Sequence, residues 1–257
     1  MSWTTDLGHP FAGIAEKLKR TDENIVNLHR EIIAFFEKSE YPILPKPDDQ
    51  RWQEAVDYHS RLRIPIRFSV LAGEIVHHLR SSLDHIVWIF SNDAYRLSRA
   101  NAIEFPVLCK IPDKDKAAKF ERNIKGVDKP SVRKLITDLQ PYQSGASTIN
   151  NPLCIIHDMD RFDKHRELVI VTACANLTFP AGISVDLVRK VMAYKQGEPL
   201  TTSDVDAVQR TMKQDAEVRP QISFAKLGKR ETEFAIPVLA HLLNTVDDVV
   251  SMFASEI

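Results

Sequence analysis

The stretch GEIVHHLRSSLDH, residues 73–85, decides the interpretation of the fold, because its apolar residues recur at helical spacing. The pattern continues in both directions and predicts one long helix over residues 66–94. About half of its circumference is polar, although apolar sequence flanks the stretch on both sides. An unpaired buried polar group costs about 1–3 kcal/mol, so we expect these side chains to find partners inside a bundle. The apolar side of the helix consists of Leu71, Ile75, Leu79, Ile86 and Phe90.

Three further segments show the same helical period and predict the rest of the bundle, over residues 11–39, 152–166 and 234–257. The block at about 167–228 is rich in β-branched residues and alternates near its end, which predicts antiparallel strands. We therefore expect an α+β fold, mainly a helical bundle with an antiparallel β-sheet packed on one side, in a single domain over 1–257.

Two connections are less regular. Pro42, Pro45 and Pro47 predict an extended connection between the first two helices, up to about Arg63, since proline disfavours helix. Residues 201–217 fit either a helix or a loop.

The composition excludes several classes of function. Lys and Arg number 34 against 35 Asp and Glu, so no global field attracts nucleic acid or an anionic membrane. The N-terminus lacks the features of a signal peptide and no apolar run is long enough to span a bilayer, so we expect a cytoplasmic protein without membrane contact. The three cysteines are an odd number without CxxC spacing, which predicts buried small residues rather than disulfides or zinc ligands.

The polar residues of the 66–94 helix form two neighbouring stripes at 100° per residue. Glu74, His78 and His85 share one stripe. The next stripe holds His77, Arg80, Ser81 and Asp84. A second charged segment, HDMDRFDKHR at residues 157–166, supplies the natural partners. The candidate binding residues are expected to meet in one polar cluster: Glu74, His78, Arg80, Asp84 and His85 with Asp163, His165 or Arg166. The alternative is ordinary helix ion pairs at spacing four, such as Arg80 with Asp84 and Asp160 with Lys164.

The motifs LAGEIVHHLRSSLDHIVW and DKHREL resemble a widespread set of uncharacterised bacterial proteins with the pattern GE, HxLRSxLDH and DKHR. This resemblance covers most of the chain and implies no function. Within it, Arg80 and His85 are similar to the R-x4-H motif of the HEPN superfamily, helical-bundle proteins that include metal-independent ribonucleases of bacterial defence and toxin systems. The resemblance implies that Arg80 and His85 are catalytic, that RNA or a nucleotide is bound, and that a homodimer completes the site.

The implied chemistry suits these residues, because histidine transfers protons near neutral pH and arginine binds phosphate through a fork of two donors. Two features depart from the HEPN pattern. Ser81 follows the arginine, where HEPN nucleases often carry an amide. An unbroken helix also points Arg80 and His85 about 140° apart, so they converge only if the helix kinks or the arginine wraps around it.

Two other classes of function stay open. A metal-binding bundle could use Glu74, His78 and His85 with Asp158 or His165, but the usual ligand spacings are absent, so we expect no metal and no cofactor. A non-catalytic, partner-binding protein could use the charged helices as an ion-pair network.

Trp88 and the basic segment each have one functional and one purely structural interpretation. Trp88 fits either a stacking surface for a base or core packing. The basic segment from Lys110 to Lys134 fits either a track for a phosphate backbone or a solvated charged surface.

Overall fold

A computed structural model describes residues 8–42, 49–144, 148–164, 170–174, 220–224 and 233–257. The described residues fall into two compact units. The first unit takes its residues from 1–22, 73–166 and 242–257, and the second takes them from 23–72 and 167–241. The single domain expected from the sequence stays a prediction.

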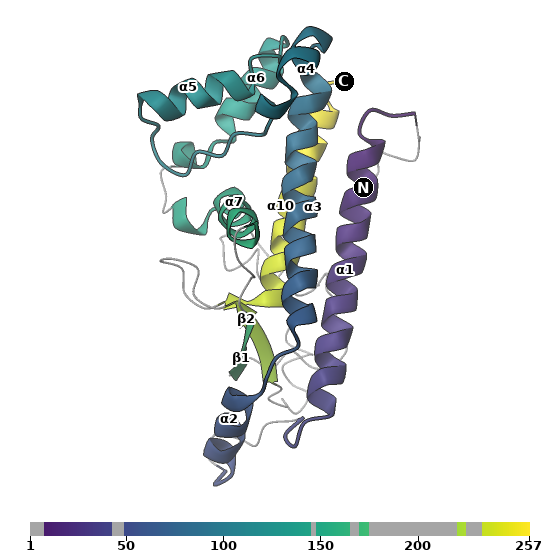
Figure 1. The fold of residues 1–257 in the computed structure, drawn as a ribbon, viewed down its shortest axis with the longest axis vertical. Coiled ribbons are helices and arrows are strands. Elements are labelled where there is room, and N and C mark those ends of the chain that lie inside the picture. Colours follow the sequence, from purple (N-terminus) through teal and green to yellow (C-terminus); the bar gives the residue numbers. More distant parts are fainter. Residues whose placement is uncertain (1–7, 43–48, 145–147, 165–169, 175–219, 225–232) are drawn as a thin grey trace, which may run out of the picture. The chain divides into compact units, whose positions relative to one another are not determined.

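The four main helices predicted from periodicity are confirmed (Figure 1). They are α1 (Ala12–Glu37), α3 (Ile66–Phe90), α7 (Pro152–Asp163) and α10 (Ala235–Ala254). The start of α7 is capped, since the Asn151 side chain accepts a hydrogen bond from Leu153 N at 3.0 Å and proline occupies the first helical position. Helices α1, α3 and α10 each contribute residues to both units.

Helix α3 ends at Phe90, before the predicted residue 94, because the next helix has its own cap. Asn92 accepts a hydrogen bond from Tyr95 N at 2.9 Å and starts α4 (Asp93–Arg99). Arg96 of α4 donates to the carbonyl oxygens of Trp88 and Ile89, at 2.9 and 2.7 Å. These bonds satisfy acceptors that the end of α3 leaves free.

The core of the first unit gathers aromatic and aliphatic side chains from distant parts of the chain. The Phe253 ring of α10 lies 6.1 Å from Phe90 and 6.2 Å from Phe105, measured between ring centroids. Leu79, Leu83 and the two rings Phe105 and Phe253 are fully buried. The polar stretch of α3 therefore lies against a packed apolar core, as the sequence indicated.

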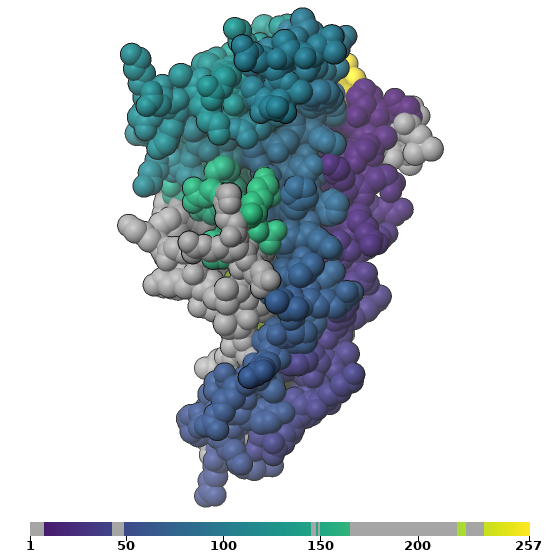
Figure 2. Space-filling model, in the orientation of Figure 1, coloured from purple at the N-terminus to yellow at the C-terminus, as the bar shows by residue number. Residues whose placement is uncertain are grey.

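The basic segment from Lys110 to Lys134 folds into short helices. They are α5 (Lys114–Asn123) and α6 (Pro130–Asp138), and single 3-10 turns lie at Ala100–Ala102, Pro141–Ser144 and Thr148–Asn150. The space-filling view shows the side chains of this region as one continuous surface (Figure 2).

The second unit corrects one expectation about the linker. A helix, α2 (Trp52–Arg61), occupies much of the region where an extended connection was predicted. The prolines restrict only residues before it, and Ala55 and His59 bury one side of a helical turn. His59 Nε2 lies 2.9 Å from the Tyr41 carbonyl oxygen, so the buried ring has a polar partner.

The predicted α+β class is wrong, because the described residues are mostly helical. No sheet layer covers one side of a bundle in the part of the chain that the structure describes. The strands described there are β1 (Ile170–Cys174), β2 (Pro220–Phe224) and β3 (Glu233–Phe234), which pair antiparallel in the order β1-β2-β3. Helix α2 contacts β1. The β-branched composition of 167–228 suggested more, but most of that block, including 201–217, lies outside the described residues.

The expectation of unpaired cysteines is also corrected. Cys109 and Cys154 form a disulfide with a Cα–Cα distance of 5.8 Å, within the usual range. The bond joins the segment before α5 to α7. Spacing could not reveal it, because the two residues are 45 positions apart and belong to no motif.

Helix α10 is long and apolar enough to cross a membrane by length and composition, and no other described helix is. Most of its apolar window is buried inside the protein, however. Core helices of folded proteins pass the same test, so α10 gives only weak evidence of a membrane span.

Candidate functional site

The polar residues of α3 face three different neighbours instead of one shared cluster, and one of these is Asp160 of α7, which lies beside His77. Arg80 and Asp84 face the extended segment around Phe105, whereas Ser81 and His85 face Lys17 of α1. Arg80 and Asp84, which helical spacing places on one stripe, thus share a neighbour, whereas Ser81 of the same stripe contacts the partner of His85.

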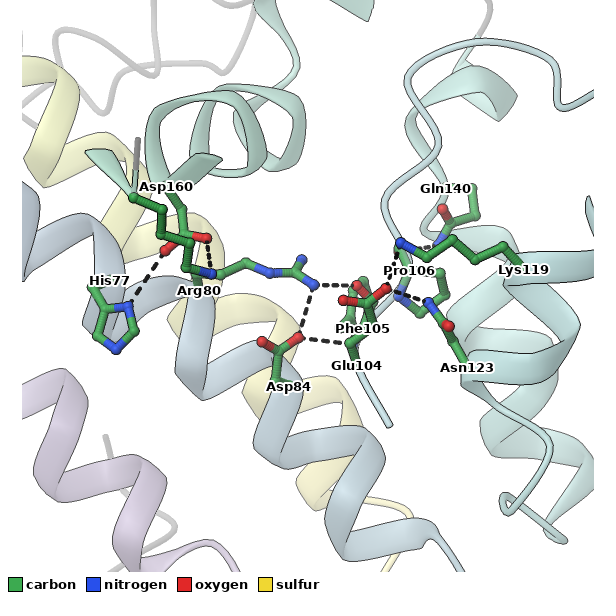
Figure 3. Close-up of polar contacts among 11 residues, drawn as sticks. His77, Arg80, Asp84, Glu104, Phe105, Pro106, Lys119, Asn123, Gln140 and Asp160 are labelled. Atoms are coloured by element: carbon green, nitrogen blue, oxygen red, sulfur yellow. Dashed lines mark hydrogen bonds and ion pairs between the residues drawn. The ribbon is translucent and has the colours of Figure 1, made fainter. Parts of the chain in front are cut away.

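Arg80 is a buried residue with partners inside the chain (Figure 3). Its Nη2 atom donates to Phe105 O at 2.7 Å and lies 2.8 Å from Asp84 Oδ1. Asp84 Oδ1 in turn accepts a hydrogen bond from Phe105 N at 2.9 Å. Burial raises the pKa of Asp84, and the Arg80 charge opposes this shift. The pair therefore holds both backbone polar groups of Phe105, which is a structural role.

The same extended segment is fixed by further polar contacts on both sides of Phe105 (Figure 3). Glu104 accepts a hydrogen bond from Asn123 at 2.9 Å and pairs with Lys119 at 2.8 Å. Gln140 donates to Pro106 O at 3.0 Å and accepts from Leu108 N at 2.9 Å. The region around Arg80 thus ties α3 to α5 and, through Gln140, to α6. Among the described residues, the buried Arg80 Nη1 atom has no hydrogen-bond partner.

Helices α3 and α7 meet, as expected, but mainly through other residues than those predicted. His77 Nδ1 lies 3.4 Å from Asp160 Oδ1, and Asp160 also pairs with Lys164 at 2.7 Å (Figure 3). A Cβ atom added to Gly73 would lie only 2.8 Å from Asp163 Cγ, so the missing side chain at Gly73 makes room for that carboxyl group.

The remaining predicted binding residues are spread out. Glu74 is exposed, and His78 is half-buried with a pKa lowered first by burial and then by the charges of His77 and Lys17. His165 and Arg166 lie outside the described residues. Within the part of the chain that is described, no group of three His, Cys, Asp or Glu residues could hold a metal ion.

His85 has a different environment from Arg80. Lys17 Nζ donates to Ser81 Oγ at 2.5 Å and lies 3.4 Å from His85 Nε2. Burial and then the Lys17 charge lower the pKa of His85, so the imidazole is neutral at neutral pH. Helix α3 is continuous from Ile66 to Phe90, so its geometry keeps Arg80 and His85 on different sides. The two side chains have separate partners and do not converge within one chain.

His85 lies at the wall of an open groove of about 740 Å³ in the first unit, which we call the Trp88 groove. Its polar and aromatic wall consists of His85, Trp88, Arg96, Lys129 and Glu256. The Trp88 side chain is 41% exposed, and the Arg96 guanidinium carbon lies 5.6 Å from the centre of its ring. This distance places a cation on the indole face.

Sequence reasoning identified His85 and Trp88, and Lys129 as a member of the basic segment, but missed Lys17 and Arg96. Those residues come from parts of the chain that meet only after folding, so no local spacing could mark them. The basic segment as a whole proved less open than its charge suggested, because several of its cations already pair with carboxylates: Lys116 with Asp113, Lys119 with Glu104, Lys129 with Glu256, Arg133 with Glu121 and Lys134 with Asp138.

No family model, no curated protein and no solved structure matches this chain. The resemblance of the R-x4-H motif to the HEPN superfamily therefore stays a prediction.

Proposed function

We propose that this protein binds single-stranded RNA or a nucleotide in the Trp88 groove. One observation carries the proposal: an exposed indole lies in a groove, with a guanidinium on its ring and a lysine in the same wall. Bases stack on aromatic side chains whatever their sequence, and cations in the same groove contact the phosphates. The low net charge of the chain fits a local groove of this kind better than a binding surface spread over the whole protein.

The environment of His85 assigns it a binding role in this proposal. With its pKa lowered, the neutral ring offers one donor and one acceptor to a base or a ribose hydroxyl. Such a contact does not depend on a charged imidazole. Binding is therefore expected to change little between neutral and mildly alkaline pH.

Arg80 is not assigned to the chemistry. Its ion pair with Asp84 and its hydrogen bond to Phe105 O support a structural role for the arginine of the HEPN-like motif. This network also supports the alternative that the charged residues of α3 near Arg80 form a non-catalytic ion-pair network.

The homodimer implied by the resemblance is testable by light scattering on the same samples.

The binding experiment uses fluorescence anisotropy of a labelled single-stranded RNA of about 12 nucleotides, with AMP as a competing nucleotide. Stacking on an aromatic side chain is worth about 1–3 kcal/mol per base, so Trp88→Leu should weaken binding about 5- to 150-fold. Trp52→Leu, in α2 of the second unit, is the matched control and should bind like the wild type. Equal affinities for all three proteins, or no binding to RNA and AMP, would contradict the proposal.

A cleavage assay in EDTA separates binding from ribonuclease activity. We expect the wild-type protein to leave the bound RNA intact. Cutting in EDTA that His85→Ala abolishes without a change in the thermal melt would replace binding by metal-independent cleavage as the function of the groove.

A further inference from the structure

An internal carboxylate, that of Glu256, lies in the wall of the Trp88 groove next to Lys129. Glu256 Oε2 lies 3.1 Å from Lys129 Nζ and accepts a hydrogen bond from Ser131 Oγ at 2.6 Å. Lys129 also donates to the main-chain oxygen of Glu256. The bonds from Ser131 and Lys129 lower the pKa of Glu256, so its carboxylate is charged at neutral pH.

The donors around this carboxylate suit a phosphate equally well. Lys129 is the N-cap residue of α6 and makes no side-chain cap bond, Pro130 is the first helical residue, and Ser131 follows. The ammonium, the hydroxyl and the positive end of the helix dipole all favour an anion at this place. Phosphate oxygens accept hydrogen bonds from the same donors as a carboxylate does.

The contact between Glu256 and Lys129 can also be broken without unfolding the protein. Glu256 follows the end of α10 at Ala254, and its N–H donates to Phe253 O at 3.0 Å. The side chains of Lys129 and Glu256 remain 47% and 26% exposed. Exposed ion pairs contribute little to stability, so a competing anion can displace Glu256 without disturbing the buried core.

We propose that Glu256 is an autoinhibitory group that occupies the phosphate position of the Trp88 groove, and that a phosphate of the bound RNA or nucleotide displaces it from Lys129 and Ser131. This inference rests on the proposed function of the groove. In the free protein Glu256 shields Lys129, and in the complex the last turn after α10 is released.

The test compares Glu256→Gln with Glu121→Gln, using the labelled RNA and inorganic phosphate as a competitor. Glu121 pairs with Arg133 at 2.7 Å and is no part of the groove, so both variants remove one negative charge and one ion pair. Exposed pairs of this kind are weak, and Glu256→Gln should therefore bind RNA about 3- to 5-fold more tightly than the wild type. Glu121→Gln should bind like the wild type, and inorganic phosphate should compete with RNA.

Hydrogen exchange gives a second readout, independent of affinity. RNA should speed exchange at the Glu256 amide of the wild type, whereas Lys129→Gln should weaken binding with or without Glu256→Gln. If the wild type binds RNA through Trp88 but the two glutamate variants have equal affinities, the autoinhibitory role is wrong and the groove function stands. If neither the wild type nor Glu256→Gln binds RNA or AMP, both proposals fail.

Discussion

Arg80 and Asp84 are buried together, and their energetic role follows from that burial. The arginine side chain is 6% exposed, and removing the guanidinium would leave the Asp84 carboxyl group largely enclosed without its cation. Breaking a buried pair by removing one partner costs about 3–5 kcal/mol, and the partial exposure of Asp84 reduces this figure. The main role of the Arg80–Asp84 contact of α3 is thus to stabilise the folded protein.

The corresponding prediction is that Arg80→Met lowers the free energy of unfolding by about 2–3 kcal/mol, measured by urea denaturation. Arg67→Met is the matched control, since Arg67 pairs with Glu31 at the same 2.8 Å distance but is 66% exposed. That change should cost about 0.5 kcal/mol or less. Equal losses in the two variants would mean that the Arg80 network carries no special weight.

Asp163 gives a prediction about pH. Burial, and then the charge of Asp160, raises the pKa of Asp163 above its ordinary value of 3.8. The protonated form is therefore favoured by folding, and this contribution is complete below pH 3.8 and is lost as the pH rises through the raised pKa. Asp163→Asn should stabilise the protein at neutral pH, and the gain should disappear in urea titrations below pH 3.8. A gain of the same size at both pH values would contradict the assigned pKa shift.

At the scale of the elements, the close approach of α3 and α7 depends on Gly73. Alanine is about 1 kcal/mol better than glycine inside a helix, yet its Cβ atom would lie 2.8 Å from Asp163 Cγ. We expect Gly73→Ala to destabilise the wild type, and to stabilise the Asp163→Ala variant by about 0.5–1 kcal/mol. A double-mutant cycle of unfolding free energies measures the coupling, and additive effects would show that the two residues do not touch.

The main helices could be predicted from the sequence because each of them buries one apolar stripe. The helical spacing of the apolar residues in that stripe is visible in the sequence. Sequence reasoning also separated the Arg80 side of α3 from the His85 side. The ion pairs at spacing four, Arg80 with Asp84 and Asp160 with Lys164, are both present. Sequence reasoning could not assign the contacts of α3 with Phe105, Lys17 and Asp160, since these lie in other segments and helical spacing carries no information about which segment packs on which face.

For the whole molecule, the sequence did not predict the extent of the sheet or the Trp88 groove, and both depend on tertiary packing. The fold class was wrong because β-branched composition over 167–228 was taken as evidence for a sheet layer, whereas the described strands have five, five and two residues. The Trp88 groove combines residues from both ends of the chain and from its middle. Contacts of that kind arise only from tertiary packing.

The disulfide gives a prediction that concerns the first unit as a whole. Closing a loop of 45 residues constrains the unfolded chain, so Cys109→Ser should lower the free energy of unfolding by about 2–4 kcal/mol. Thiol titration under denaturing conditions checks the bond itself. Of the three cysteines, one should react before reduction and three after it. Three reactive thiols in the unreduced protein would show that Cys109 and Cys154 are not joined.

If the Trp88 groove contacts RNA, ultraviolet crosslinking of the wild-type protein to single-stranded RNA should attach the RNA to residues of that groove. Trypsin releases residues 81–96 as one peptide, which contains His85 and Trp88. We expect this peptide to carry the RNA adduct, and Trp88→Leu should remove the adduct. An adduct found mainly between Lys110 and Lys125 of the basic segment, with residues 81–96 unmodified, would show that RNA binds elsewhere.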